Sequence, residues 1–265
     1  IVIGYALNDL AVGAFSTSQV LLGIIATIGG AVAALTFPGF SKMFTEGRLE
    51  EVRSGSLVGE RYITLLTMPL SVVIMVDPVT MLSVLFGAEA TIAADALRVL
   101  AFANLILLMN QVHYTQILAA NKPRVVARMT ILSVAVLIGL LAVLIPNELL
   151  GMPMLGLGIV GAGWAWLGCN TVIVIMTRFA VWKISQTSLN RRIWRHFAGG
   201  IVVGIVLWAI GQSIGLTGLP RLILELSTAF ALYFGLMIAA QEFDRKDLAY
   251  FLDIMNPRTM KEYVS

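Results

Sequence analysis

The stretch NLILLMNQVHYTQILAANKPR, Asn104 to Arg124, has the length and apolar character of a membrane-spanning helix, yet it carries amides and a histidine in its middle. A helix needs about 20 mostly apolar residues to cross the hydrocarbon layer of a bilayer. Polar side chains at that depth face the interior of a helix bundle or a water-filled cavity, because lipid offers them no hydrogen-bond partner. This stretch raises two questions: whether the whole chain is a membrane protein, and what the polar side chains of the stretch contact.

The composition answers the first question. Of the 265 residues, 58% are hydrophobic and 12% are charged, and the mean hydropathy is +0.90. Soluble domains carry about 25% charged residues. The long, continuous apolar runs predict helices rather than the short alternating strands of a barrel, so we expect an all-α polytopic membrane protein whose main partner is the lipid bilayer. The basic residues lie in loops, so the net charge of +3 predicts no nucleic-acid partner.

Seven segments are long and apolar enough to cross a membrane. We place them near residues 13–38, 57–76, 96–119, 125–145, 157–182, 197–215 and 221–240. Residues 1–8 resemble the end of a truncated helix, residues 9–240 form the transmembrane bundle, and residues 241–265 form a charged tail. The charged stretch 41–62 is expected to be a long connection that holds a short surface helix, with Met43 and Phe44 toward the membrane.

The distribution of Lys and Arg predicts the orientation. With seven crossings, sixteen of the 18 basic residues fall on one side of the membrane, and only Arg98 and Arg221 fall on the other. Loops rich in Lys and Arg stay in the cytoplasm. We therefore predict a multi-pass protein of the cell membrane with a cytoplasmic C-terminus.

The third predicted helix has one polar and one apolar face. The polar arc on a helical projection consists of Asn104, Asn110, Gln111, His113, Tyr114 and Thr115, and the apolar arc includes Leu105, Leu108 and Val112. A one-sided polar helix in a membrane turns that side toward the bundle or toward water. We predict that the polar arc lines a substrate cavity. Hydrogen bonding between packed helices is the alternative, and the sequence leaves it open.

The chain lacks the residue patterns of a catalytic site. We find no nucleophile elbow, no paired carboxylates and no cluster of metal ligands, and Cys169 is the single cysteine. No carboxylate is predicted in the middle of a spanning segment. The run LGIVGAGWAWLG contains Gly158, Gly161 and Gly163, which favour close helix packing rather than phosphate binding. We therefore predict that the chain is not an enzyme and that it binds no cofactor or metal.

Several motifs, taken in order, resemble one family of transporters. VGAFSTSQVLLGIIATIGGAVAALTFPGFSKMF, VLFGAEATIAADALRVLAF and QILAANKPRVVARMTILSVAVLIGLLAVLIP, followed by GIVGAGWA, cover most of the chain. Together they resemble the polysaccharide and lipid-linked oligosaccharide flippases of the multidrug/oligosaccharidyl-lipid/polysaccharide exporter superfamily. The closing segment resembles archaeal members of this family.

The resemblance implies a fold and a mechanism. Such flippases have fourteen helices in two bundles around a central cavity, so the seven segments would be the second bundle, and the first bundle of the same chain would be missing. They move a polyprenyl-linked glycan by alternating access, with H⁺ or Na⁺ as a candidate coupling ion. The cavity would then include Ser16 and Gln19 as well as the polar arc. Several relatives carry an arginine, which holds pyrophosphate, near the position of Gln19. Here a cationic contact for an anionic headgroup would come from Arg98, from the missing bundle, or from neither.

Three other functions remain open at this stage. A cation-coupled multidrug antiporter of the same superfamily would need a buried carboxylate. A polyprenyl-dependent membrane glycosyltransferase would need acidic residues close together in a loop at the membrane edge. A helical scaffold without transport activity would not need the polar arc. The sequence does not specify the glycan or its lipid carrier.

Overall fold

The computed structural model describes residues 7–242, which form an all-α bundle. Within this part of the chain, seven helices are long and apolar enough to cross a membrane. The predicted fold class, an all-α polytopic membrane protein with about seven spans, is therefore confirmed. The predictions for residues 1–8 and for the tail fall almost entirely outside the described residues.

The elements follow one another along the chain with short connections. They are α2 (Asp9–Thr45), α3 (Leu49–Val76), α4 (Pro78–Phe86), the 3₁₀ helix η1 (Ala88–Ala93), α5 (Ala94–Ala119), α6 (Pro123–Leu144), α7 (Gly158–Ser185), α8 (Ile193–Ser213) and α9 (Gly218–Ala239). A two-stranded antiparallel hairpin, β1 (Glu148–Leu149) and β2 (Met152–Pro153), joins α6 to α7, with Glu148 opposite Pro153. Side chains cap two of the helices: Asn8 accepts a hydrogen bond from the Ala11 N–H, and Asp77 accepts one from the Thr80 N–H.

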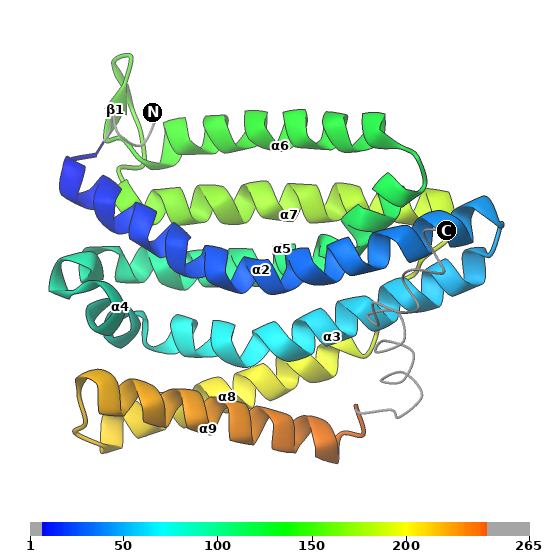
Figure 1. The fold of residues 1–265 in the computed structure, drawn as a ribbon. Helices are drawn as coiled ribbons and strands as arrows, with labels where there is room; N and C mark the ends of the chain where they lie inside the picture. The colour runs from blue at the N-terminus through cyan, green and yellow to red at the C-terminus, as the bar shows by residue number, and fades with distance from the viewer. Residues whose placement is uncertain (1–6, 243–265) are drawn as a thin grey trace.

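Helix α5 lies at the centre of the bundle. Helices α2, α3 and α7 pack against it, α6 covers α7, and α8 and α9 pack on the far side of α3 (Figure 1). Helix α5 buries Leu97, Leu105 and Ile117 completely. The outer helices expose large apolar side chains, for example Ile131 and Trp208. A contiguous exposed apolar surface is expected where lipid, rather than water, surrounds the protein.

The connection between α2 and α3 differs from the prediction. Helix α2 continues to Thr45 and α3 begins at Leu49, so a three-residue turn replaces the expected surface helix. Gly47 takes the left-handed conformation that this turn requires, with φ of 72°. The side chain of Met43 is buried in the core instead of facing the membrane. The prediction was wrong because charged residues on the extended ends of two helices were interpreted as a loop.

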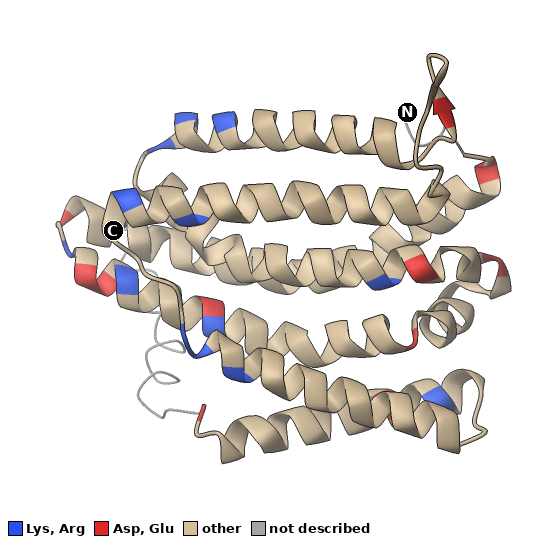
Figure 2. Ribbon diagram, turned by 180° about the vertical axis from the view of Figure 1, so that it is seen from behind, with Lys and Arg blue, Asp and Glu red and all other residues tan. Residues whose placement is uncertain are grey.

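The basic side chains gather at one end of the bundle (Figure 2). We call this the basic end; it contains the α2–α3 turn, the α5–α6 turn and the α7–α8 connection. The opposite end contains α4, η1, the β-hairpin and the α8–α9 connection. The arrangement is the one expected from the positions of Lys and Arg in the sequence, whereas the compartment that each end faces stays a prediction.

Candidate functional site

Three charged or titratable side chains meet in the interior between α3, α5 and α7. The Nε2 atom of His113 lies 3.2 Å from a carboxylate oxygen of Glu60 and 2.9 Å from a guanidinium nitrogen of Arg178. Arg178 also forms a salt bridge with Glu60. The side chains of Glu60 and His113 are 1% and 0% exposed, and that of Arg178 is 19% exposed. We call these three residues the buried ionic cluster.

Close helix packing brings this cluster together. A Cβ atom added to Gly59 would lie 3.1 Å from a methyl group of Val112, so the absence of a side chain at Gly59 lets α3 approach α5. The next residue along α3, Glu60, is thereby placed opposite His113, the residue after Val112. Arg178 reaches the pair from α7, which packs along the other side of α5.

The hydrogen bonds of the cluster depend on which ring nitrogen of His113 carries a hydrogen. Its Nε2 atom faces both a hydrogen-bond acceptor, Glu60, and a donor, Arg178. A ring nitrogen can donate to the carboxylate or accept from the guanidinium, but not both at once. The tautomer and charge of His113 therefore determine which of the two contacts is a hydrogen bond. Charged side chains inside a membrane bundle are generally paired with one another, as Glu60 is with Arg178 here.

A second polar network lies nearer the basic end, at the end of α7. The side-chain amide of Gln116 donates hydrogen bonds to the hydroxyls of Ser185 and Thr187, at 2.6 and 3.1 Å. The guanidinium of Arg53 donates to the backbone carbonyl of Ser185. This network connects α3 and α5 to the end of α7, so part of the polar content of α5 serves packing, as the alternative interpretation of the sequence held.

The polar arc predicted on α5 divides into two groups. Asn104, Gln111 and Tyr114 are partly exposed, whereas Asn110 and His113 are buried. The partly exposed positions follow helical spacing on one face, which we call the α5 stripe: Asn104, Leu107, Gln111, Tyr114 and Leu118. The apolar arc of Leu105, Leu108 and Val112 is buried. Whether the stripe lines a substrate cavity stays a prediction.

Several polar atoms of α5 have unused hydrogen-bonding capacity. Within the described residues, the buried atoms Asn104 Nδ2, Asn110 Oδ1, His113 Nδ1 and Gln116 Oε1 have no hydrogen-bond partner. Buried polar side-chain atoms nearly always have a partner, in the protein or in ordered water. Four such atoms lie on α5, so the packing of the described helices leaves part of its hydrogen-bonding capacity unused.

The other predicted site residues lie apart from the buried ionic cluster. Ser16 is exposed and donates its hydroxyl hydrogen to the Val12 carbonyl of its own helix, while Gln19 is partly exposed on the same helix. Arg98 is exposed, donates to the Met75 carbonyl at 2.9 Å and pairs with Asp95 at 3.0 Å. These contacts hold Arg98 at the surface, and its predicted role in binding a headgroup stays a prediction.

The expectation that no carboxylate lies in the middle of a spanning segment was wrong, because Glu60 is buried within α3. Glu225 is also buried, near the start of α9. Glu225 accepts a hydrogen bond from Arg221, which also pairs with Asp77 at 2.6 Å and so connects α9 to the end of α3. Glu60 was overlooked because it was counted with the loop charges. The available signal was an acidic residue, a histidine and an arginine placed two to three turns from the basic ends of three different helices.

A metal site does not form among residues 7–242, in which no three His, Cys, Asp or Glu side chains come together. The helices expose apolar side chains on their outer surface, bury an ionic cluster between them and leave the α5 stripe partly exposed. These features define a polytopic helical membrane protein with features typical of transporters.

Comparison with known proteins specifies this class further. Residues 1–95 match the model of a family described as "Polysaccharide biosynthesis protein". The chain is also 26% identical over 245 residues to a protein of Haloferax volcanii, the "Probable low-salt glycan biosynthesis flippase Agl15". The aligned region covers 89% of this chain and 47% of that protein, so the chain spans about half the length of its curated relative. No solved structure matches the chain. The resemblance to the polysaccharide and lipid-linked oligosaccharide flippases is confirmed.

Proposed function

We propose that this chain is part of a flippase that moves a lipid-linked glycan precursor across the cell membrane. The observation that carries the proposal is the polar character of α5, the central helix, with its partly exposed amides and its buried atoms that lack partners. A helix of this kind is suited to line a water-filled pathway. The similarity to a glycan biosynthesis flippase supplies the substrate class.

The proposed pathway requires a second bundle. By the family resemblance, the helices described here are the eighth to the fourteenth of a two-bundle transporter that works by alternating access. In this arrangement the α5 stripe faces the cavity between the bundles. The glycan binds in that cavity, while the polyprenyl chain stays in lipid. The basic end lies in the cytoplasm, as the positive-inside rule predicts.

The chemistry of the stripe suits a sugar that must be released again. Amide and phenol groups both donate and accept hydrogen bonds, so Asn104, Gln111 and Tyr114 can pair with glycan hydroxyls in several orientations. Each such neutral hydrogen bond contributes only about 1 kcal/mol, because it replaces a hydrogen bond to water. Weak, adaptable contacts favour transport over tight binding.

A flux measurement on the full-length protein tests this proposal. The variant Asn104→Leu/Gln111→Leu should lower the translocation of a lipid-linked glycan in proteoliposomes by at least about tenfold, because it removes two hydrogen-bonding amides from the pathway. The variant Thr130→Leu/Thr171→Leu is the matched control, since it removes two exposed polar side chains from α6 and α7. Wild-type flux in the Asn104/Gln111 variant, with the control also unaffected, would reject the proposed role of the stripe.

Cation-coupled multidrug antiport is the second candidate, and the buried ionic cluster favours it. This function needs a carboxylate inside the bundle that binds H⁺ or Na⁺, and Glu60 is such a group. The same proteoliposomes distinguish the two candidates. An antiporter would move an organic cation, but no glycolipid, when a proton or sodium gradient is imposed, whereas the flippase moves the glycolipid.

A further inference from the structure

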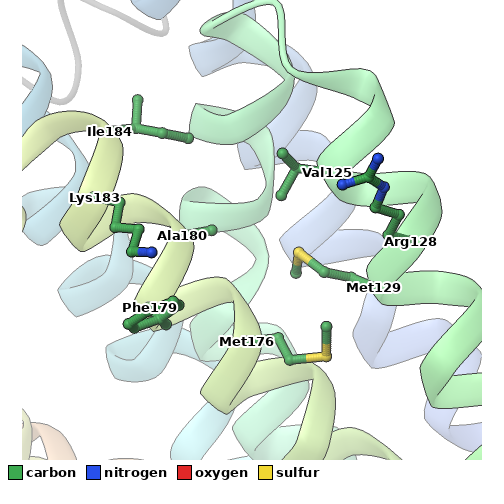
Figure 3. A pocket seen from close by; sticks show the side chains of 8 residues that line it. All are labelled: Val125, Arg128, Met129, Met176, Phe179, Ala180, Lys183 and Ile184. Atoms are coloured by element: carbon green, nitrogen blue, oxygen red, sulfur yellow. The ribbon is translucent and has the colours of Figure 1, made fainter.

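A groove opens between α6 and α7 near the basic end (Figure 3). Its volume is about 410 Å³, and its walls are mostly apolar. Sites for small molecules in proteins have volumes of about 300 to 1,000 Å³. The groove is therefore large enough to hold part of a lipid molecule.

The walls of the groove suit an alkyl chain. Met129 on α6 and Met176 on α7 extend into the space between the two helices, and Phe179 and Ala180 continue the α7 wall (Figure 3). Methionine side chains are flexible and polarizable, so they adapt to a partner of variable shape. The small side chain of Ala180 keeps the groove open.

Two cations, Arg128 and Lys183, lie at the groove. Arg128 is in the second turn of α6 and Lys183 is in the last turn of α7. The ammonium group of Lys183 lies 4.4 Å from the centre of the Phe179 ring. In the part of the chain that the structure describes, neither cation forms a salt bridge, and neither α6 nor α7 contains Asp or Glu. The groove therefore complements an anion that carries an apolar chain.

The side chains around the groove are those expected at the level of the lipid headgroups. Trp182 on α7 is 52% exposed, and its ring lies 6.4 Å from that of Phe179. Exposed Trp residues are enriched at the level of the lipid headgroups. Lys and Arg side chains near the ends of spanning helices extend their charges into the same layer. A phosphate bound at Arg128 and Lys183 would thus lie where membrane lipids carry it.

We propose that this groove binds one anionic glycerophospholipid of the cytoplasmic leaflet. One chain of the lipid lies between Met129 and Met176, and its phosphate lies between Arg128 and Lys183. Basic pockets between transmembrane helices on the cytoplasmic side are known sites for anionic headgroups. A resident phospholipid fits a groove lined by two cations better than a transported lipid, which must leave again. The inference does not depend on transport activity.

Lipid retention by the full-length protein tests this inference. The protein is reconstituted into phosphatidylcholine bilayers that contain a minor share of phosphatidylglycerol, and the lipids that it retains are counted by native mass spectrometry. Wild type should retain one phosphatidylglycerol in preference to phosphatidylcholine. Arg128→Gln/Lys183→Gln should lower that retention by at least about tenfold, because two cations at the headgroup are lost.

Two further variants separate the groove from the general surface charge. Arg124→Gln/Arg191→Gln removes the same charge from exposed positions at the same end that do not line the groove, and it should retain the lipid like wild type. Ala180→Phe keeps both cations but fills the groove, and it should lose the lipid. Since Arg128 and Lys183 are exposed, the variant that lacks them should still fold.

The inference is overturned by any of four results. The first is that wild type retains phosphatidylcholine as well as phosphatidylglycerol, and the second is that Arg128→Gln/Lys183→Gln or Ala180→Phe retains phosphatidylglycerol like wild type. The third is that the Arg124/Arg191 control loses as much lipid as the groove variants. The fourth is that a polyprenyl phosphate preferentially displaces phosphatidylglycerol. The last result would assign the groove to the transported lipid instead. None of them changes the flux expected of the stripe variants, so the two proposals fail separately.

Discussion

At the scale of single residues, the buried ionic cluster is the feature with the largest energetic consequence. Glu60 and Arg178 are 118 residues apart in the sequence, yet they form a salt bridge inside the bundle with His113 beside it. Removing one partner of a buried ion pair leaves an uncompensated charge, whereas removing both can be nearly neutral. The ion pair therefore fixes α3 against α7, but it contributes little more to the free energy of unfolding than apolar residues at the same positions would.

A double-mutant cycle tests this coupling. Glu60→Gln alone and Arg178→Gln alone should each lower the free energy of unfolding by about 3 kcal/mol, because each removes one partner of an ion pair whose carboxylate is buried. The double variant should lose less than the sum of the two, by at least about 1 kcal/mol. Denaturation of the purified protein in detergent measures these values.

The ion pair between Arg53 and the exposed Glu50 provides the control for this cycle. The Glu50 side chain is 84% exposed, so Glu50→Gln should change stability by no more than about 0.5 kcal/mol. Additive losses at Glu60 and Arg178 would contradict the direct pairing of these residues.

At the scale of helices, hydropathy and glycine spacing predicted much of the packing. Gly161 and Gly163 were expected to allow close approach. A Cβ atom at Gly161 would lie 2.6 Å from the Leu144 carbonyl oxygen, and one at Gly163 would lie 3.0 Å from that of Ala96. Gly158 has a different role, because its φ of 54° is left-handed and an added Cβ atom would make only an ordinary contact, 3.9 Å from a methyl group of Leu7. Spacing alone cannot distinguish a packing glycine from a turn glycine.

Substitution of Gly161 should weaken the α6–α7 contact. Gly161→Ala places a methyl group against a backbone carbonyl that cannot move without shifting the chain, so we expect a loss of about 1 to 3 kcal/mol in unfolding free energy. Gly235→Ala on α9 has open space around the added methyl group. It should be neutral or stabilising by up to about 1 kcal/mol, because alanine favours helix. Equal effects in the two variants would argue against close packing at Gly161.

At the scale of the whole molecule, the sequence predicted the class of fold better than the site. Continuous apolar runs indicate spanning helices because the bilayer imposes the same requirement on every segment. The buried ionic cluster could not be predicted in this way, because it depends on which helices are neighbours and how deep each residue lies. The arcs of α5 were visible in the sequence, but their helical period does not reveal which polar residues pack against α3 and α7 and which stay partly exposed.

Labelling of single cysteines measures whether the α5 stripe faces a water-filled pathway in the full-length protein. In a Cys169→Ala background, cysteines at positions 104, 111 and 114 should react with a water-soluble maleimide in the membrane-embedded protein. Cysteines at the buried positions 105, 108 and 112 should not. Added glycolipid should slow the reaction at the stripe. Equal protection at all six positions would contradict the proposed pathway and leave α5 as a packing helix.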